Sequence, residues 1–265
     1  MDVTAILIAV AVVSIIGLLI GLLLGVAGKK FEVKVDERVT LVREHLAGSN
    51  CGGCGYAGCD ACAAAIVAGE ASPNACPPAG AAAAAAIGEV LGIAVEEGVR
   101  KAAFVKCAGT CDKTTMKSQY YGITDCQKAS LIPGSTDKNC NNGCMGFGSC
   151  VKACKFDAIH IVNGIAVVDR DKCTACGACT AVCPKNLIVL IPADAKYMVR
   201  CSSREKGKTV KAACTAGCIG CGICAKQCKV GAVTVANNLA TIDPEKCVGC
   251  GKCAAKCPSK VITMG

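Results

Sequence analysis

The chain has 265 residues and 26 cysteines, but only four phenylalanines, four tyrosines and no tryptophan. So few large aromatic side chains cannot fill extensive apolar cores, which leaves disulfides or metal centres to hold small domains together. The formal net charge is +9, which by itself would be compatible with nucleic acid. The lack of aromatic side chains argues against a base-stacking surface, and we expect no nucleic-acid partner.

Residues 1–30 predict a single transmembrane helix. Residues 3–27 contain no charged side chain, and a helix of this length exceeds the ~30 Å hydrocarbon core of a bilayer. The run is too long, and its start too poor in basic residues, for a cleaved signal peptide. Lys29, Lys30 and Lys34 follow the run, so the positive-inside tendency places the soluble domains on the cytoplasmic side of the cell membrane. That compartment is reducing, which disfavours disulfides.

Residues 31–100 are expected to form a small helical domain next to the membrane. Val39, Val42 and Leu46 have helical spacing, and alanine-rich helices are expected near 61–69 and 79–92. The sequence CGGCGYAGC, followed later by CPP, has the spacing for one [4Fe–4S] cluster. Its glycines allow the backbone N–H groups to approach the cluster sulfurs. The expected ligands are Cys51, Cys54, Cys59 and Cys76, whereas Cys62, one helical turn after Cys59, is expected to pack in the core.

The rest of the chain contains an internal repeat with an offset of 74 residues. Seven cysteine pairs share it, Cys140 and Cys214 form an eighth pair, and Asn163 and Asn237 mark the turns of two predicted β-hairpins. We therefore expect an α+β protein with two bacterial-type 2[4Fe–4S] ferredoxin-like domains, at 140–195 and 196–265. A cysteine-containing region, 101–139, connects them to the membrane-proximal domain.

The spacing C-x2-C-x2-C-x3-C assigns cysteines to clusters. Three cysteines of the run bind one [4Fe–4S] cluster, and the fourth binds the other cluster of the pair. Zinc sites usually use two distant C-x2-C pairs, so the spacing favours iron–sulfur clusters over zinc. In the second copy the expected sets are Cys218, Cys221, Cys224 and Cys257 for one cluster, and Cys228, Cys247, Cys250 and Cys253 for the other.

The first copy departs from this pattern, because Phe147 occupies the position of one cysteine. One set is complete, with Cys154, Cys173, Cys176 and Cys179. The other has Cys144, Cys150 and Cys183, and Cys140 is favoured as its fourth ligand. Without Cys140, this site would hold a [3Fe–4S] cluster or use a ligand that is not a thiolate.

The remaining cysteines leave the number of clusters at five or six. Cys107, Cys111 and Cys126 are candidate ligands of a sixth cluster together with Cys140, but this would compete with the assignment above, and free buried thiols are the alternative. Cys201 and Cys214 have no evident partners. The sequence contains no glycine-rich nucleotide loop after a predicted strand, so we expect no NAD or flavin site on this chain.

The apolar anchor, the CGGCGYAGC and CPP sequences and the duplicated ferredoxin motifs together resemble the B subunit of Rnf complexes. The resemblance implies an electron-transfer subunit of a membrane-bound translocase, the ion-translocating ferredoxin:NAD+ oxidoreductase. Such a subunit takes electrons from soluble ferredoxin and passes them to integral membrane and flavoprotein subunits. By position, the membrane-proximal cluster would be the exit and the C-terminal pair the entry. The alternatives are a membrane-anchored polyferredoxin that serves a hydrogenase or another reductase, and a zinc or disulfide scaffold.

Overall fold

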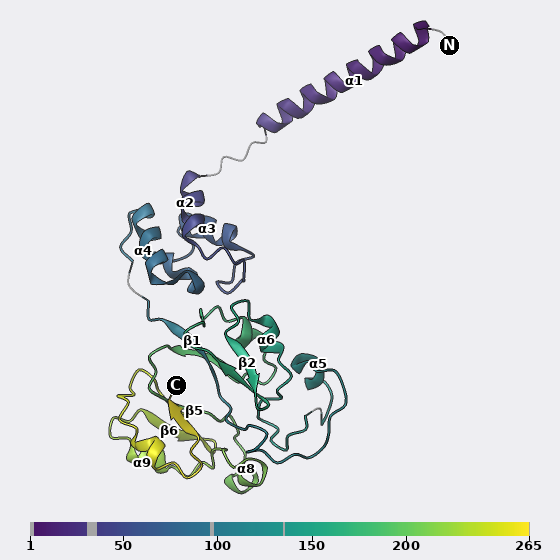
Figure 1. Cartoon of the computed structure of the whole chain (residues 1–265). Helices are drawn as coiled ribbons and strands as arrows, with labels where there is room; N and C mark the ends of the chain where they lie inside the picture. Colours follow the sequence, from purple (N-terminus) through teal and green to yellow (C-terminus); the bar gives the residue numbers. More distant parts are fainter. Residues whose placement is uncertain (1–2, 31–35, 96–97, 135, 265) are drawn as a thin grey trace.

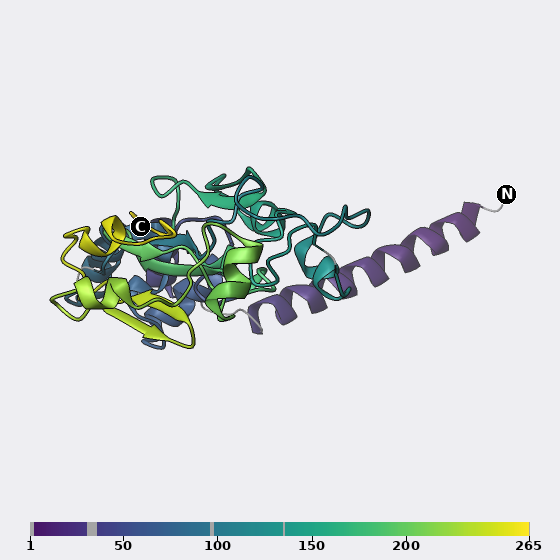
Figure 2. The ribbon, with the colours of Figure 1, turned by 90° about the horizontal axis from the view of Figure 1, so that it is seen from below.

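The computed structural model describes residues 3–30, 36–95, 98–134 and 136–264. Helix α1 (Val3–Lys30) projects away from the other elements in both views (Figures 1 and 2). Its segment Ala11–Gly28 is apolar and unburied in the protein, and the helix is long enough to cross a membrane. Lys34, one of the basic residues expected to orient this helix, lies outside the described residues.

Three helices and two short 3-10 turns form the domain that follows α1. They are α2 (Glu37–His45), α3 (Cys59–Val67), η1 (Pro73–Ala75), η2 (Pro77–Ala79) and α4 (Gly80–Leu91). The Asp36 carboxylate begins α2 by accepting a hydrogen bond from Arg38 N at 2.9 Å. Val42, Cys62 and Ile87 are buried in the shared core. The helical character expected for this domain is confirmed.

The ferredoxin-like part of the chain repeats element by element at the predicted offset. The equivalent pairs are α6 (Ser149–Ala153) and α9 (Ile223–Gln227), β2 (Ile159–Val162) and β6 (Val233–Ala236), β3 (Ile165–Val168) and β7 (Leu239–Ile242), α7 (Ala178–Ala181) and α10 (Lys252–Ala255), and β4 (Ile188–Pro192) and β8 (Ile262–Met264). The strands β2 and β3, and likewise β6 and β7, form antiparallel hairpins. Asn163 and Asn237 have positive φ in the two turns, as the hairpin prediction requires.

Each copy also has an incoming strand that pairs with its last strand. Strand β1 (Lys101–Val105) is antiparallel to β4, and β5 (Tyr197–Val199) is antiparallel to β8. Val105 pairs with Ile188, and Val199 pairs with Ile262, so the two valines occupy equivalent positions. The chain between the incoming strand and α6 is longer than the matching segment before α9 and contains α5 (Cys126–Ser130), whereas the second copy has α8 (Gly207–Ala213). The two incoming strands therefore do not follow the 74-residue offset.

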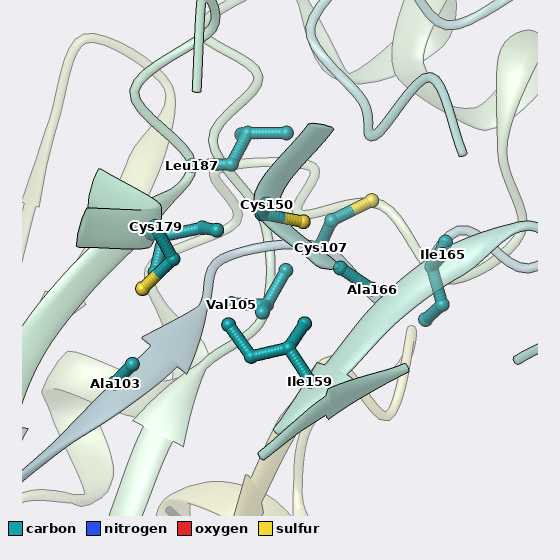
Figure 3. Close-up of a cluster of buried hydrophobic side chains, with 10 residues drawn as sticks. Ala103, Val105, Cys107, Cys150, Ile159, Ile165, Ala166, Cys179 and Leu187 are labelled. Carbon is teal, nitrogen blue, oxygen red and sulfur yellow. The ribbon is translucent and has the colours of Figure 1, made fainter. Parts of the chain in front are cut away.

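The cysteines lie within the apolar cores of both copies. Cys107, Cys150 and Cys179 surround a core that includes Val105 and Ile159 (Figure 3). The core of the second copy likewise contains buried cysteines, namely Cys218, Cys224 and Cys253. Clusters bound there would complete cores whose buried residues, as far as the structure describes them, include no aromatic side chain.

Candidate metal centres

All 26 cysteines are free thiols in the structure. Within the described ranges, no three or more His, Cys, Asp or Glu side chains are close enough together to hold a single metal ion. Most of the cysteines instead line five pockets among the described residues, with four or five cysteines in each pocket. A cubane fits such an arrangement because each thiolate binds a different iron atom. Five cysteines line none of these pockets, namely Cys111, Cys228, Cys247, Cys250 and Cys253.

The first pocket lies in the membrane-proximal domain and brings together the four cysteines expected there. It is lined by Cys51, Cys54, Cys59, Cys62 and Cys76. The Asn50 side chain helps to place this set, because its Oδ1 accepts a hydrogen bond from Cys59 N at 2.7 Å, at the start of α3. Cys62, the fifth cysteine, is 1% exposed. Its burial, with a contribution from Cys54, raises its pKa to about 12.

The second pocket brings together the complete set of the first ferredoxin-like copy, namely Cys154, Cys173, Cys176 and Cys179. Two of the sulfurs accept backbone hydrogen bonds, from Ala103 N to Cys173 Sγ at 3.3 Å and from Ala158 N to Cys154 Sγ at 3.4 Å. Such N–H groups stabilise thiolates that bind a cluster. Burial raises the pKa of Cys179 to about 12, so a metal that binds there must displace a proton.

The third pocket differs from the sequence-based expectation. Cys144, Cys150 and Cys183 line it together with Cys126. Burial raises the pKa of Cys150 to about 11, and the neighbouring cysteines, Cys126 among them, add to the shift. Cys140 lines a different pocket, where it lies near Cys107. The structure therefore brings Cys126, and not Cys140, to the incomplete set.

Hydrogen bonds between α5 and α6 explain the position of Cys126. Cys126 N donates to Ser149 Oγ at 2.7 Å, and Ser149 Oγ donates to Asp125 Oδ2 at 2.9 Å. The aromatic ring of Phe147 packs against Tyr120, with ring centroids 5.2 Å apart. The extra segment of the first copy thus folds back over α6 and presents a cysteine where Phe147 interrupts the motif.

The fourth pocket contains the expected C-terminal set Cys218, Cys221, Cys224 and Cys257. The other C-terminal set consists of Cys228, Cys247, Cys250 and Cys253, and three of these cysteines lie near one another. The pKa of Cys253 is raised by burial and by Cys247 and Cys250 nearby, while Cys228 packs against the same core. Cys250 is exposed, as is Cys221 of the fourth pocket, so both C-terminal sets reach the protein surface.

The three cysteines proposed for a sixth cluster lie at three separate places. Cys107 lines the same pocket as Cys140, which we call the fifth pocket, and Cys126 lines the third. Cys111 is exposed, and its backbone N–H donates to Asn163 O at the β2–β3 turn, at 3.0 Å. The expectation that Cys107, Cys111 and Cys126 share a cluster is therefore not supported by the geometry.

Three family models match the chain in the regions of these pockets. An "Fe-S cluster" model matches residues 46–78, a "4Fe-4S binding domain" matches 166–189, and a "4Fe-4S dicluster domain" matches 217–261. Iron–sulfur and 4Fe-4S ferredoxin domains are thus present.

Curated relatives cover nearly the whole chain. The B subunit of the Na(+)-translocating ferredoxin:NAD(+) oxidoreductase complex of Acetobacterium woodii is 45% identical over 91% of this chain and 73% of the relative. The B subunit of the ion-translocating oxidoreductase complex of Methanosarcina acetivorans is 42% identical over 97% of both chains. The chain belongs to the Rnf B-subunit family. Another member, from the proton-translocating ferredoxin:NAD(+) oxidoreductase complex of Clostridium ljungdahlii, is 42% identical over 88% of this chain and 82% of the relative.

The three family models do not cover every pocket of this Rnf B-subunit family member. The matched ranges contain the cysteines of the first pocket and all eight cysteines of the two C-terminal sets. Several cysteines that line the third and fifth pockets lie outside all three ranges, among them Cys107, Cys126, Cys140, Cys201 and Cys214. The placement of these five depends on tertiary contacts, and no short motif in the sequence marks them.

Proposed function

We propose that the chain is the electron-input subunit of an ion-translocating ferredoxin:NAD+ oxidoreductase complex. It accepts electrons from reduced soluble ferredoxin and passes them to integral membrane partner subunits. A [4Fe–4S] cluster, when bound, accepts and releases one electron at a time. The observation that carries the proposal is that the cysteine set of the domain next to α1 packs on a cysteine set of the first ferredoxin-like copy. Partner flavoprotein subunits supply the flavin and NAD+ chemistry.

The contact between the membrane-proximal domain and the first ferredoxin-like copy supports this path. A Cβ added at Gly53 would lie within 3.0 Å of the backbone carbonyl carbon and Cα of Cys176. Lys155 Nζ donates to Ser49 O at 3.3 Å and to Asn50 O at 3.2 Å. The loop that carries Cys51 and Cys54 therefore packs directly on the loop that carries Cys176.

We assign the ligands of five [4Fe–4S] clusters from the sets described above. Cys126 takes the position of the fourth ligand beside Cys144, Cys150 and Cys183, so this site needs no three-iron cluster. The proposed domains are the anchor (1–30), the membrane-proximal domain (31–100), the connecting region (101–139) and the two ferredoxin-like domains (140–195 and 196–265). The connecting region also contributes to the first ferredoxin-like copy, because β1 pairs with β4.

The proposal places the chain in the cell membrane by α1 alone, with its soluble domains in the cytoplasm. We expect a protease to digest these domains in inverted membrane vesicles and to leave them intact in sealed right-side-out vesicles. Immunoblotting against the C-terminus would measure the digestion, and detergent-treated vesicles of both kinds would be the control. Digestion in right-side-out vesicles alone would contradict the proposed orientation.

Cys250→Ala tests the entry of electrons through the C-terminal domain. The variant is expected to lose between about one and four irons, because one cluster loses a ligand, and to oxidise reduced ferredoxin much more slowly. Iron analysis and stopped-flow spectroscopy under anaerobic conditions would measure both. Cys111→Ala is the matched control, since Cys111 is also exposed but lies outside every assigned set. Unchanged iron content and rate in Cys250→Ala would refute the assignment.

The partners can be identified by affinity purification of the tagged chain from membranes. Integral membrane subunits and flavoproteins are the expected companions. Recovery of a hydrogenase in their place would favour a polyferredoxin that serves another enzyme.

A further inference from the structure

One pocket remains without an assigned function, although four cysteines line it. They are Cys107, Cys140, Cys201 and Cys214. None of them belongs to a C-x2-C motif, and none lies in a range that a family model matches. Cys107 and Cys214 are buried, while Cys140 and Cys201 are partly buried.

The internal repeat relates these four cysteines as two equivalent pairs. Cys107 and Cys201 each follow the incoming strand by two residues, after Val105 and Val199 respectively. Their preceding residues make the same hydrogen bond, from Lys106 N to Leu187 O and from Arg200 N to Val261 O, at 2.8 and 2.9 Å.

Cys140 and Cys214 form the second pair, because each precedes the first cysteine of a cluster run by four residues. Each copy of the repeat thus contributes the same two positions to one pocket. Unrelated buried thiols would have no reason to meet in this symmetric way. The arrangement indicates one shared site between the two copies.

Two glycines show how closely the sulfurs approach one another. A Cβ added at Gly109 would lie 3.3 Å from Cys214 Sγ and 3.7 Å from Cys107 Sγ. A Cβ added at Gly143 would lie 3.4 Å from Cys140 Sγ and 3.7 Å from Cys107 Sγ. Cys201 lines the same pocket as Cys140.

Basic side chains around the pocket favour an anionic occupant. Lys106 and Arg200, themselves equivalent in the repeat, line the pocket together with Lys138 and one acidic residue, Glu205. Lys138 is only 5% exposed, and its Nζ donates to Gly109 O at 2.8 Å. A buried ammonium group is costly unless a negative charge lies near it. Four thiolates that hold a cluster would supply that charge.

Hydrogen bonds to the sulfurs also fit a cluster. Cys144 N donates to Cys107 Sγ at 3.4 Å, and Thr114 Oγ1 donates to Cys214 Sγ at 3.8 Å. Donors of this kind stabilise cluster thiolates and tune their reduction potential. Cys201 packs against the core that contains Cys218.

We propose that Cys107, Cys140, Cys201 and Cys214 bind a sixth [4Fe–4S] cluster at the junction of the two ferredoxin-like copies. Cys144, which contacts Cys107, belongs to a set of the first copy, and Cys218, in the core against which Cys201 packs, belongs to a set of the second. The shared site therefore lies between the two pairs of clusters. Electron transfer through this cluster from one pair to the other rests on the proposed function, whereas the binding of a cluster at this site does not.

The test compares iron and acid-labile sulfide in the anaerobically purified full-length chain and in the double variant Cys140→Ala/Cys214→Ala. The wild type is expected to contain about 24 irons, and the double variant about four fewer, with the same loss of sulfide. The control is Cys111→Ala, which removes an exposed thiol that belongs to no assigned set and lines none of the five pockets. The control is expected to keep the wild-type iron content.

A wild-type content of about 20 irons would overturn the sixth cluster. A double variant that keeps all of its iron, or that loses one zinc ion in place of iron, would overturn it as well. If cells do not accumulate the double variant, Cys201→Ala is measured in its place. An iron content and an EPR spectrum equal to those of the wild type would then overturn the sixth cluster. Ferredoxin oxidation is measured separately on the wild type. A protein with about 24 irons that does not oxidise ferredoxin would refute the proposed function and leave the sixth cluster in place.

Discussion

Replacing Gly53 with valine is expected to separate the membrane-proximal domain from the first ferredoxin-like copy and to stop electron flow to the membrane partners. Backbone atoms of Cys176 occupy the space that the new side chain needs. Backbone atoms cannot move aside as a flexible side chain can, and overpacking of this kind costs about 1–3 kcal/mol. The loop of Cys51 and Cys54 would therefore move away from the loop of Cys176, while each cluster keeps all its ligands.

The measurement follows the clusters after they are reduced by ferredoxin in the assembled complex. In Gly53→Val they are expected to become reduced at the normal rate but to remain reduced, and the iron content should not change. Gly98→Val is the matched control, because a Cβ at Gly98 would meet no heavy atom of the described residues within 4 Å. If Gly53→Val reoxidises its clusters as fast as the wild type, this contact is not on the electron path.

The sequence predicts those cysteine sets whose geometry is fixed over a short stretch of chain. Cys173, Cys176 and Cys179 lie on one loop and the start of α7, so their spacing alone determines that they face one centre. The crossing of the fourth cysteine follows from the duplication of the motif. The structure gathers Cys154 with this set, and Cys257 with the set of Cys218, as that reasoning predicts.

The cysteines that the structure places elsewhere than the sequence predicts, or that the sequence leaves without partners, depend on contacts between distant segments. Cys126 reaches the third pocket because Ser149 and Asp125 connect α6 to α5. The spacing of cysteines along the sequence does not predict such a contact. Cys201 looked unpaired because the two copies differ in length after their incoming strands. The pairing of β1 with β4 and of β5 with β8 reveals that Cys201 is equivalent to Cys107.

In a Cys126→Ala variant, the site of Cys144, Cys150 and Cys183 is expected to keep three thiolates and to hold a three-iron cluster. The protein would lose about one iron, and the oxidised protein would show the EPR signal of a three-iron cluster, which the wild type lacks. Cys111→Ala is the control and should not give this signal, because Cys111 is exposed and lies outside every assigned set. Undiminished iron in Cys126→Ala, with no three-iron signal, would show that Cys126 is not the fourth ligand.

The repeat suggests a rescue experiment that distinguishes the loss of a cluster ligand from a disruption of the fold. Phe147 occupies the position that corresponds to Cys221 in the second copy, where a cysteine lines the equivalent pocket. In the double variant Cys126→Ala/Phe147→Cys, the new thiol is therefore expected to replace Cys126, to restore the lost iron and to remove the three-iron EPR signal. Phe147→Ala in the same background removes the same ring contact with Tyr120 but provides no thiol. If both double variants behave alike, Cys126 acts through packing and does not bind the cluster.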